Sequence, residues 1–402
     1  MPEGREPPAP LPGGGGAWGD WRLGRRWMRP VAALLLALCL AVPLLLRPHA
    51  VRGPRPLSSA TLSHSEPRPV GERDRYSSLA SAPAVVRAAP RITLGAHLEN
   101  AYNLSVPEQT FMADGWYWIS WPEEVQRLIE ANKIDTDKIV EVVNNIIDYD
   151  FSVEADSEAP VLRPDGRHYQ LFRFSGSFYI AEFELGDYPF HALSLPLLFE
   201  TRPLSFSLDG PTPVLLVPEP GQKGLVGAYA TIKGYREVGV SIDPMIHHYA
   251  TDFGNGGRQD YALTELRVYY RTPFLTAFLQ WVMPLLIVMT VVFMAPSLEG
   301  SLGDLRIAIP STALLTLVVM QQTYQAELPP LPYLTFLDKI YLYCYIVSIA
   351  LFILFVWGSN AYTAADDHSL ERVKRRVARA DLGFQVIAIA GLVVVALLAW
   401  RF

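Results

Sequence analysis

The chain has 402 residues, of which 50% are hydrophobic and 18% are charged, and its formal net charge at pH 7 is −6. This composition is typical of a membrane protein rather than a soluble one. The negative charge, together with the lack of a basic patch in the central part of the chain, argues against a nucleic-acid partner.

The N-terminal part of the chain is predicted to contain two disordered segments around one apolar run. Residues 1–30 and 48–90 are rich in Pro, Gly, Ser, Ala and Arg and have no apolar periodicity. Such segments bury too little apolar surface to fold, so we expect a cytoplasmic or signal n-region followed later by a linker. The apolar run 31–47 is either a signal peptide or a signal anchor, and in both cases the domain that follows is exported.

Residues 91–271 show the alternation of short β-strands and contain no long apolar run. Runs such as Ile92–Leu98 are separated by turn residues such as Pro164-Asp165-Gly166. Many short strands without intervening helices predict an antiparallel β-sandwich. Residues 123–148 have helical spacing instead and predict a helical insertion on this sandwich. Both cysteines, at 39 and 344, lie in apolar runs, so no disulfide is expected in the domain.

The last part of the chain, 272–402, is predicted to be a four-helix transmembrane bundle. Its spans cover about 274–295, 305–326, 335–357 and 383–401. A cluster of arginines precedes the 31–47 run, and a second basic cluster lies between the last two spans. Because cytoplasmic loops carry an excess of Lys and Arg, both clusters are placed in the cytoplasm and the sandwich outside it.

The second span is unusually polar for a helix that faces lipid. One face at heptad spacing is small and polar at its start, apolar in its middle and polar at its end: Ala308, Thr312, Leu315, Val319, Gln322 and Ala326. Polar side chains at membrane depth occur mainly where they meet a partner helix or water. The face therefore predicts either the lining of a pore or polar contacts between helices.

Catalytic chemistry is not indicated anywhere in the chain. The sequence has no cluster with metal-ligand spacing, no nucleophile elbow, no phosphate-binding Gly-rich loop and no persuasive pair of carboxylates. We therefore expect neither an enzyme nor a bound cofactor or metal.

Several local motifs, in order, resemble those of the pentameric ligand-gated ion channels, and specifically of the bacterial members that lack the disulfide loop. The resemblance covers about 91–402. It rests on the hairpin Tyr102–Trp121, on Pro164-Asp165-Gly166 followed by Arg173-Phe174-Ser175, on Tyr188-Pro189-Phe190, on Arg271, Pro284, Arg306 and Leu315, and on LPYLTFLD at 331–338. Singly these motifs are weak, and in this order and spacing they are strong.

The resemblance implies a homopentamer in a bacterial plasma membrane, with the second span of each subunit lining an axial pore. Each residue of the polar face then becomes a ring of five, and Leu315 forms an apolar constriction. Asp304 and Glu327 would form carboxylate rings at the inner and outer mouths, which favours permeating inorganic cations. Because Pro310 sits about one turn into the pore helix, the helix is expected to begin late or to be kinked.

The resemblance also implies that two loops transmit a stimulus from the outer domain. The 188–191 loop is expected to rest on the loop at 327–333, and the residues concerned are Tyr188, Pro189, Phe190, His191, Arg271, Pro329, Pro332 and Tyr333. His191 stands where relatives carry an Asp that engages the residue equivalent to Arg271. A neutral imidazole cannot form that ion pair, and Asp187 is an alternative partner.

The stimulus itself is left open between a small ligand and protons. Tyr249, Phe253 and Tyr261 lie in or beside the Gly-rich loop 251–260, before the last outer strand, and are candidates for binding a cationic ligand. His191, His247, His248, Asp114 and Asp187 are candidate proton-sensing groups. A non-conducting membrane receptor or scaffold with the same fold is the alternative function.

Overall fold

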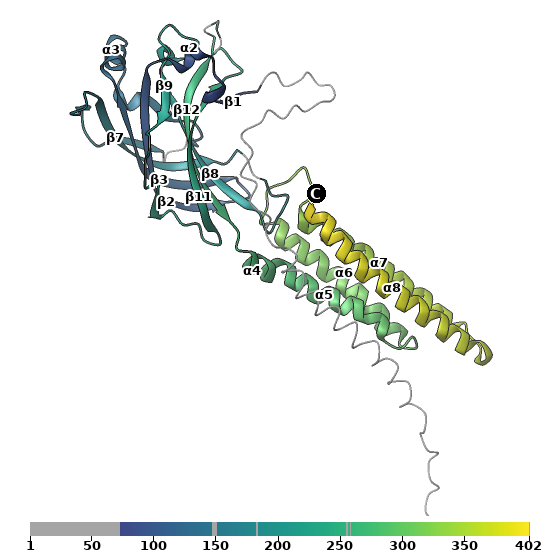
Figure 1. The fold of residues 1–402 in the computed structure, drawn as a ribbon. Coiled ribbons are helices and arrows are strands. Elements are labelled where there is room, and N and C mark those ends of the chain that lie inside the picture. Colours follow the sequence, from purple (N-terminus) through teal and green to yellow (C-terminus); the bar gives the residue numbers. More distant parts are fainter. Residues whose placement is uncertain (1–72, 147–150, 182–183, 255, 258, 402) are drawn as a thin grey trace, which may run out of the picture. The chain divides into compact units, whose positions relative to one another are not determined.

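A computed structural model describes residues 73–146, 151–181, 184–254, 256–257 and 259–401. The predicted signal segment and the first part of the predicted linker lie outside these residues. The chain divides into two compact units. We call them the sheet unit, described from 73 to 277 and again over 325–333, and the helical unit, over 278–324 and 334–401 (Figure 1).

The sheet unit consists of two β-sheets. One has the strand order β1-β11-β12-β8-β4, and the other has the order β10-β2-β3-β7-β5, with β6 paired to β7 and β9 paired to β2. The strands are β1 (Arg75–Ser78), β2 (Arg91–Ser105), β3 (Thr110–Trp121), β4 (Val140–Val142), β5 (Ser152–Ala155), β6 (Val161–Leu162), β7 (His168–Tyr179), β8 (Ala192–Thr201), β9 (Leu215–Pro218), β10 (Val226–Tyr229), β11 (Arg236–His248) and β12 (Asp260–Arg271).

Alternating side chains of the two sheets form the core between them. In β3 every second residue is buried from Phe111 to Ile119, as expected for a strand with one covered face. Tyr117 of β3 stacks on Phe172 of β7 at 4.9 Å between ring centroids and meets Phe199 of β8 at 5.4 Å. Because β8 belongs to the other sheet, these aromatic contacts join the two layers of a sandwich.

The sheets are mixed rather than purely antiparallel, which corrects one detail of the expected sandwich. Strands β9 and β10 both pair with β2 in parallel. The other named pairings are antiparallel. The alternation of side chains is the same in both kinds of pairing, so the sequence pattern did not distinguish them.

The helical insertion expected at 123–148 is an α-helix only in its first part. Helix α3 (Glu123–Ala131) buries Val125 and Ile129, as its spacing predicts. The prediction is wrong beyond it, because Val140–Val142 forms β4 and pairs with β8. Val140 and Val142 are both buried, which is the alternation of a strand. The neighbouring apolar residues Ile139 and Val143 hide this alternation in the sequence.

Ordered structure begins before residue 91, within the range predicted to be a linker. Strand β1, the short 3-10 helix η1 (Leu79–Ser81) and helix α2 (Ala84–Arg87) precede β2. Strand β1 pairs with β11 along four residues and so covers an edge of the sheet. A partner strand distant in sequence supplies these hydrogen bonds, and local composition carries no signal of it.

The helical unit contains four long helices that run side by side (Figure 1). The segments with the length and apolar character of membrane spans are Phe274–Ser297, Gly303–Gln325, Phe336–Thr363 and Asp367–Trp400. The first comprises α4 (Phe274–Ala277), the π-helical turn η4 (Phe278–Val282), α5 (Met283–Met294) and the 3-10 turn η5 (Ala295–Ser297), and the others are α6 (Gly303–Gln325), α7 (Phe336–Thr363) and α8 (Asp367–Arg401). Four such helices make this a membrane protein.

Candidate functional site

Helix α6 has a buried face and an exposed face on opposite sides. The buried residues are Arg306, Pro310, Ala313, Leu317 and Tyr324. At about 100° per residue, the predicted pore-lining residues of the helix lie roughly opposite, within a sector of about 80°. All five are exposed: Ala308, Thr312, Leu315, Val319 and Gln322. Leu315 is 67% exposed and Val319 is 55% exposed, so no neighbouring helix of the same chain covers the middle of this face.

The ends of the predicted stripe differ from its middle. Asp304 lies in the first turn of α6 and is exposed. Ala326 lies one residue beyond the end of the helix, and Ala326 and Glu327 both belong to the sheet unit. Helix α6 begins at Gly303 and continues through Pro310, so it does not begin late. The ring of Pro310 is turned to the buried side of the helix.

The hydroxyl groups of α6 donate to the backbone of their own helix. Thr312 Oγ1 donates to the carbonyl oxygen of Ala308 at 2.9 Å, and Ser311 and Thr316 make the same bond one turn back. A hydroxyl whose proton is engaged in this way presents its remaining lone pair as an acceptor. On the exposed face, Thr312 therefore presents an oxygen acceptor.

The one cationic side chain of α6 lies on the opposite side of the helix. Arg306 is 2% exposed, and its Nη2 lies 2.6 Å from Oδ2 of Asp381 in α8. Its guanidinium carbon also lies 4.1 Å from the ring centroid of Phe355 in α7. The positive charge is thus neutralised inside the bundle and is turned away from the exposed face. Sequence reasoning missed Asp381, although an acidic residue next to an apolar run was an available signal.

The other end of α6 is tied to the start of α7. The Tyr324 hydroxyl donates to Oδ1 of Asp338. The second oxygen of Asp338 accepts from the backbone N–H and the hydroxyl of Thr335, which completes a capping box at the start of α7. One carboxylate therefore holds the ends of two helices, which fixes the direction of α6 relative to α7.

The structure brings the two predicted coupling loops together inside the sheet unit. The backbone N–H of Leu185 donates to the Tyr333 hydroxyl at 3.1 Å. Burial and the charge of Glu327 raise the pKa of both Tyr188 and Tyr235, the latter to about 12. Glu327 therefore lies close to these two phenols. Pro329 is buried in its loop, whereas Pro332 is exposed.

His191 is buried next to this contact. Its Nε2 lies 3.1 Å from the Tyr235 hydroxyl oxygen, and its ring stacks on Tyr188 at 5.4 Å. Burial lowers the pKa of His191 to about 4. The imidazole is therefore neutral near pH 7, so it neither repels Arg271 nor titrates in the neutral range.

Other predicted coupling residues connect the 188–191 loop to residues 271–274, at the end of β12 and the start of α4. The His191 carbonyl accepts from both the backbone N–H and the hydroxyl of Thr272, each at 3.3 Å. Phe190 stacks on Phe274 at 4.7 Å, and Pro189 is buried between its neighbours. Arg271 is half-buried at the end of β12, where it pairs in register with Ala192 of β8.

The three predicted aromatic residues do form one group. The ring of Tyr249 lies edge-on to Phe253 at 5.0 Å and to Tyr261 at 5.8 Å. Tyr261 is buried and Phe253 is exposed, so only part of the group faces solvent. His247 adds a further ring at 3.9 Å from Tyr249.

A buried polar cluster lies behind this aromatic group. His247 Nδ1 lies 2.5 Å from Oε2 of Glu200, and the Tyr249 hydroxyl donates to Oε1 of the same carboxylate at 2.8 Å. Burial and the Glu200 charge raise the pKa of Tyr249. Tyr76 of β1 stacks on His247 at 4.4 Å between ring centroids. Asp74, just before β1, has its Oδ2 3.7 Å from Nε2 of His247. His248 is engaged separately, with its Nδ1 2.7 Å from Asp260 Oδ2.

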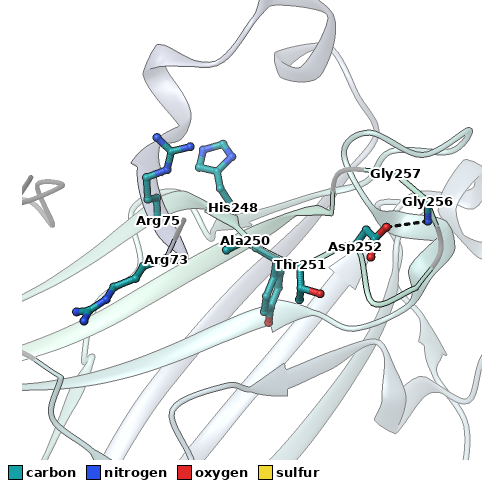
Figure 2. A pocket seen from close by; sticks show the side chains of 9 residues that line it. Arg73, Arg75, His248, Ala250, Thr251, Asp252, Gly256 and Gly257 are labelled. Carbon is teal, nitrogen blue, oxygen red and sulfur yellow. Dashed lines mark hydrogen bonds between the residues drawn. The ribbon is translucent and has the colours of Figure 1, made fainter. Parts of the chain in front are cut away.

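A pocket of about 420 Å³ opens beside this cluster (Figure 2). It is lined by Arg73, Arg75, His248, Tyr249, Ala250, Thr251, Asp252, Gly256 and Gly257. Figure 2 shows Asp252 in the loop, with its hydrogen bond to Gly256 dashed. Arg73 lies just before β1 and Arg75 is its first residue, and no sequence pattern predicted that either would line this pocket.

Neither a search for metal-binding groups nor a comparison with known proteins identifies the ligand of this pocket. Among the described residues, no group of three or more His, Cys, Asp or Glu side chains is placed to hold a metal ion. No protein-family model and no curated protein matches the chain. The layout of a β-sandwich followed by four apolar helices is consistent with that of a pentameric channel.

Proposed function

We propose that this protein is a pentameric, ligand- or proton-gated ion channel that selects cations and catalyses no reaction. The observation that carries the proposal is the exposed face of α6, which is polar at both ends and apolar at Leu315 and Val319. Polar side chains at membrane depth normally contact protein or water rather than lipid. A polar face that its own chain does not cover is therefore expected to contact other copies of the chain or water. Five copies around an axis would turn this face to a common lumen.

The selectivity of the proposed pore follows from which charges reach its lumen. Asp304 would form a ring of five carboxylates at one mouth, and Thr312 would form a ring of hydroxyl acceptors above it. Both features favour cations. The opposing charge of Arg306 is paired with Asp381 on the other side of the helix, so it would not line the lumen.

Gating would use the contact of the 188–191 loop, and of Leu185 just before it, with the 327–333 loop. The second loop follows α6 directly, so a displacement that starts at Tyr333 can reach the pore helix along the chain. A closed and an open state that differ by only a few kcal/mol can be exchanged by a ligand with modest differential affinity. We place the stimulus at the loop of Tyr249, where the polar cluster of His247 and Glu200 and the neighbouring pocket lie.

The test is the current through a planar bilayer that contains the purified protein under an asymmetric potassium chloride gradient. Stepping the outer pH from neutral to acidic separates a proton stimulus from a ligand stimulus. We expect openings that reverse near the potassium equilibrium potential. Leu315→Ser places five hydroxyls at the constriction and should leak without a stimulus, whereas Leu314→Ser makes the same change outside the exposed stripe and should not.

Two results would contradict the proposal. Silence of both the natural protein and Leu315→Ser at every pH would favour a non-conducting receptor or scaffold. Currents that reverse near the chloride potential would leave a channel but would overturn its cation selectivity.

A further inference from the structure

The start of α8 carries four arginines on one face. They lie at the spacing i, i+3, i+4 and i+7, which brings side chains to one side of a helix. All four are exposed: Arg372, Arg375, Arg376 and Arg379. We call this set the arginine row.

Packing on α7 determines which way the arginine row points. Val377 is buried, and its Cγ1 lies 3.5 Å from the position that a Cβ atom on Gly358 of α7 would occupy. At about 100° per residue, Val377 is roughly 150° around the helix from the centre of the row. The row is therefore turned away from α7.

The charges of the arginine row are not neutralised by the chain itself. Within the described residues, none of the four arginines forms an ion pair, whereas the neighbouring Lys374 lies 3.6 Å from Glu371. Like charges at these helix spacings repel one another. An anionic partner outside the chain would reduce the repulsion among these four unpaired guanidinium groups.

The depth of the arginine row indicates the kind of partner. The apolar remainder of α8, residues 382–400, is about 28 Å long at 1.5 Å per residue, which matches a hydrocarbon core of about 30 Å. The row then begins about 5 Å beyond the hydrocarbon boundary and ends about 15 Å beyond it. Lipid headgroups occupy the start of this range.

We propose that the arginine row binds the headgroups of anionic phospholipids in the leaflet that borders the α7–α8 turn. Guanidinium groups match phosphate oxygens with two parallel hydrogen bonds, and basic clusters next to a membrane helix attract anionic lipids. This binding does not depend on the proposed channel function. The arginine row ends just before Asp381 of α8, and Asp381 is the ion-pair partner of Arg306 in α6.

The experiment is native mass spectrometry of the purified full-length protein with equal amounts of phosphatidylglycerol and phosphatidylcholine. The retained lipids are counted for the natural protein and for variants of the arginine row. Arg379→Gln, nearest the hydrocarbon boundary, should lower the preference for phosphatidylglycerol about fivefold, from about 1 kcal/mol per basic residue near the surface. The effect should decrease along the row and be smallest for Arg372→Gln. The fourfold Gln variant should show almost no preference. The preference of the natural protein should also fall as the ammonium acetate concentration rises.

Three controls separate headgroup binding from other effects. Lys374→Gln changes a charge on the same turns but outside the row and should keep the preference. A charge-matched fourfold variant in the sheet unit should keep it too: Arg127→Gln, Arg202→Gln, Lys223→Gln and Lys233→Gln. A fourfold Arg→Lys variant keeps the charges and should retain most of it, which guards against loss through misfolding.

The proposal is overturned if the fourfold Gln variant keeps its preference, or if the charge-matched variant loses as much. It is also overturned if the preference is insensitive to salt, or if the Arg→Lys variant loses as much as the Gln variant.

Discussion

At the scale of single residues, burial decides which titratable groups can respond to pH. His191 and His247 are both almost fully buried, yet their surroundings differ. His191 faces the phenols of Tyr188 and Tyr235, and burial lowers its pKa to about 4. His247 lies between the carboxylates of Glu200 and Asp74. A proton stimulus near neutral pH therefore does not act at His191.

The depressed pKa of His191 predicts a loss of stability in acid. Between pH 6.5 and pH 4 the unfolded state binds a proton at this residue and the folded state does not, so the stability falls as pH falls. The full effect is about 3 kcal/mol per chain. Thermal unfolding in detergent, followed by intrinsic fluorescence over this range, should show a smaller acid loss for His191→Gln. The exposed His368→Gln is the control, and an equal acid loss in all three proteins would contradict the burial argument.

Asp304 gives the second prediction at this scale. Asp304→Asn removes five charges from the proposed ring without changing the size of the side chain. We expect the reversal potential in a potassium chloride gradient to move from near the potassium value toward zero. Glu299→Asn, outside the pore helix, is the comparison. An unchanged reversal potential would place the selectivity ring elsewhere.

At the scale of elements, a few polar side chains determine how α6 is held. Arg306 ties its first turns to α8 through Asp381, and Tyr324 ties its last turn to Asp338 at the start of α7. Both contacts leave from the buried face. The exposed face is thus a consequence of where the polar anchors lie, and apolar packing at Ala313 and Leu317 completes the buried side.

The Arg306–Asp381 pair predicts a characteristic pattern in a double-mutant cycle. Arg306→Met leaves an uncompensated carboxylate in the bundle and should destabilise the protein by about 3–5 kcal/mol, and Asp381→Leu should do the same to the guanidinium. The double variant Arg306→Met, Asp381→Leu buries no charge and should be more stable than either single variant. Thermal unfolding in detergent measures this, and simple addition of the two losses would show that the charges do not interact.

At the scale of the whole molecule, the exposed apolar side chains of α6 point to self-association. Leu315, Val318 and Val319 are exposed on the least apolar of the four membrane helices. In an assembly they would face the lumen and the neighbouring subunits. The same argument does not apply to the outward apolar residues of α7 and α8, which lipid can cover.

This predicts a defined oligomer. Native mass spectrometry of the detergent-solubilised protein should give the mass of five chains, because the proposed pore needs five copies of the α6 face. Replacing Gln321, whose Oε1 accepts from the Tyr345 hydroxyl within one chain, should leave that mass unchanged. A monomer would remove the proposed pore.

The sequence by itself determined the division into a strand-rich domain and four apolar helices, and the order of polar and apolar residues along one stripe of α6; the structure decided that this stripe is exposed. Both follow from periodicity, which is a local property of the chain. Only the tertiary structure decided the strand at β4, the docking of β1 beside His247, and the pairing of Arg306 with Asp381. Each of these joins segments far apart in the chain, and their energy comes from partners that local patterns do not encode.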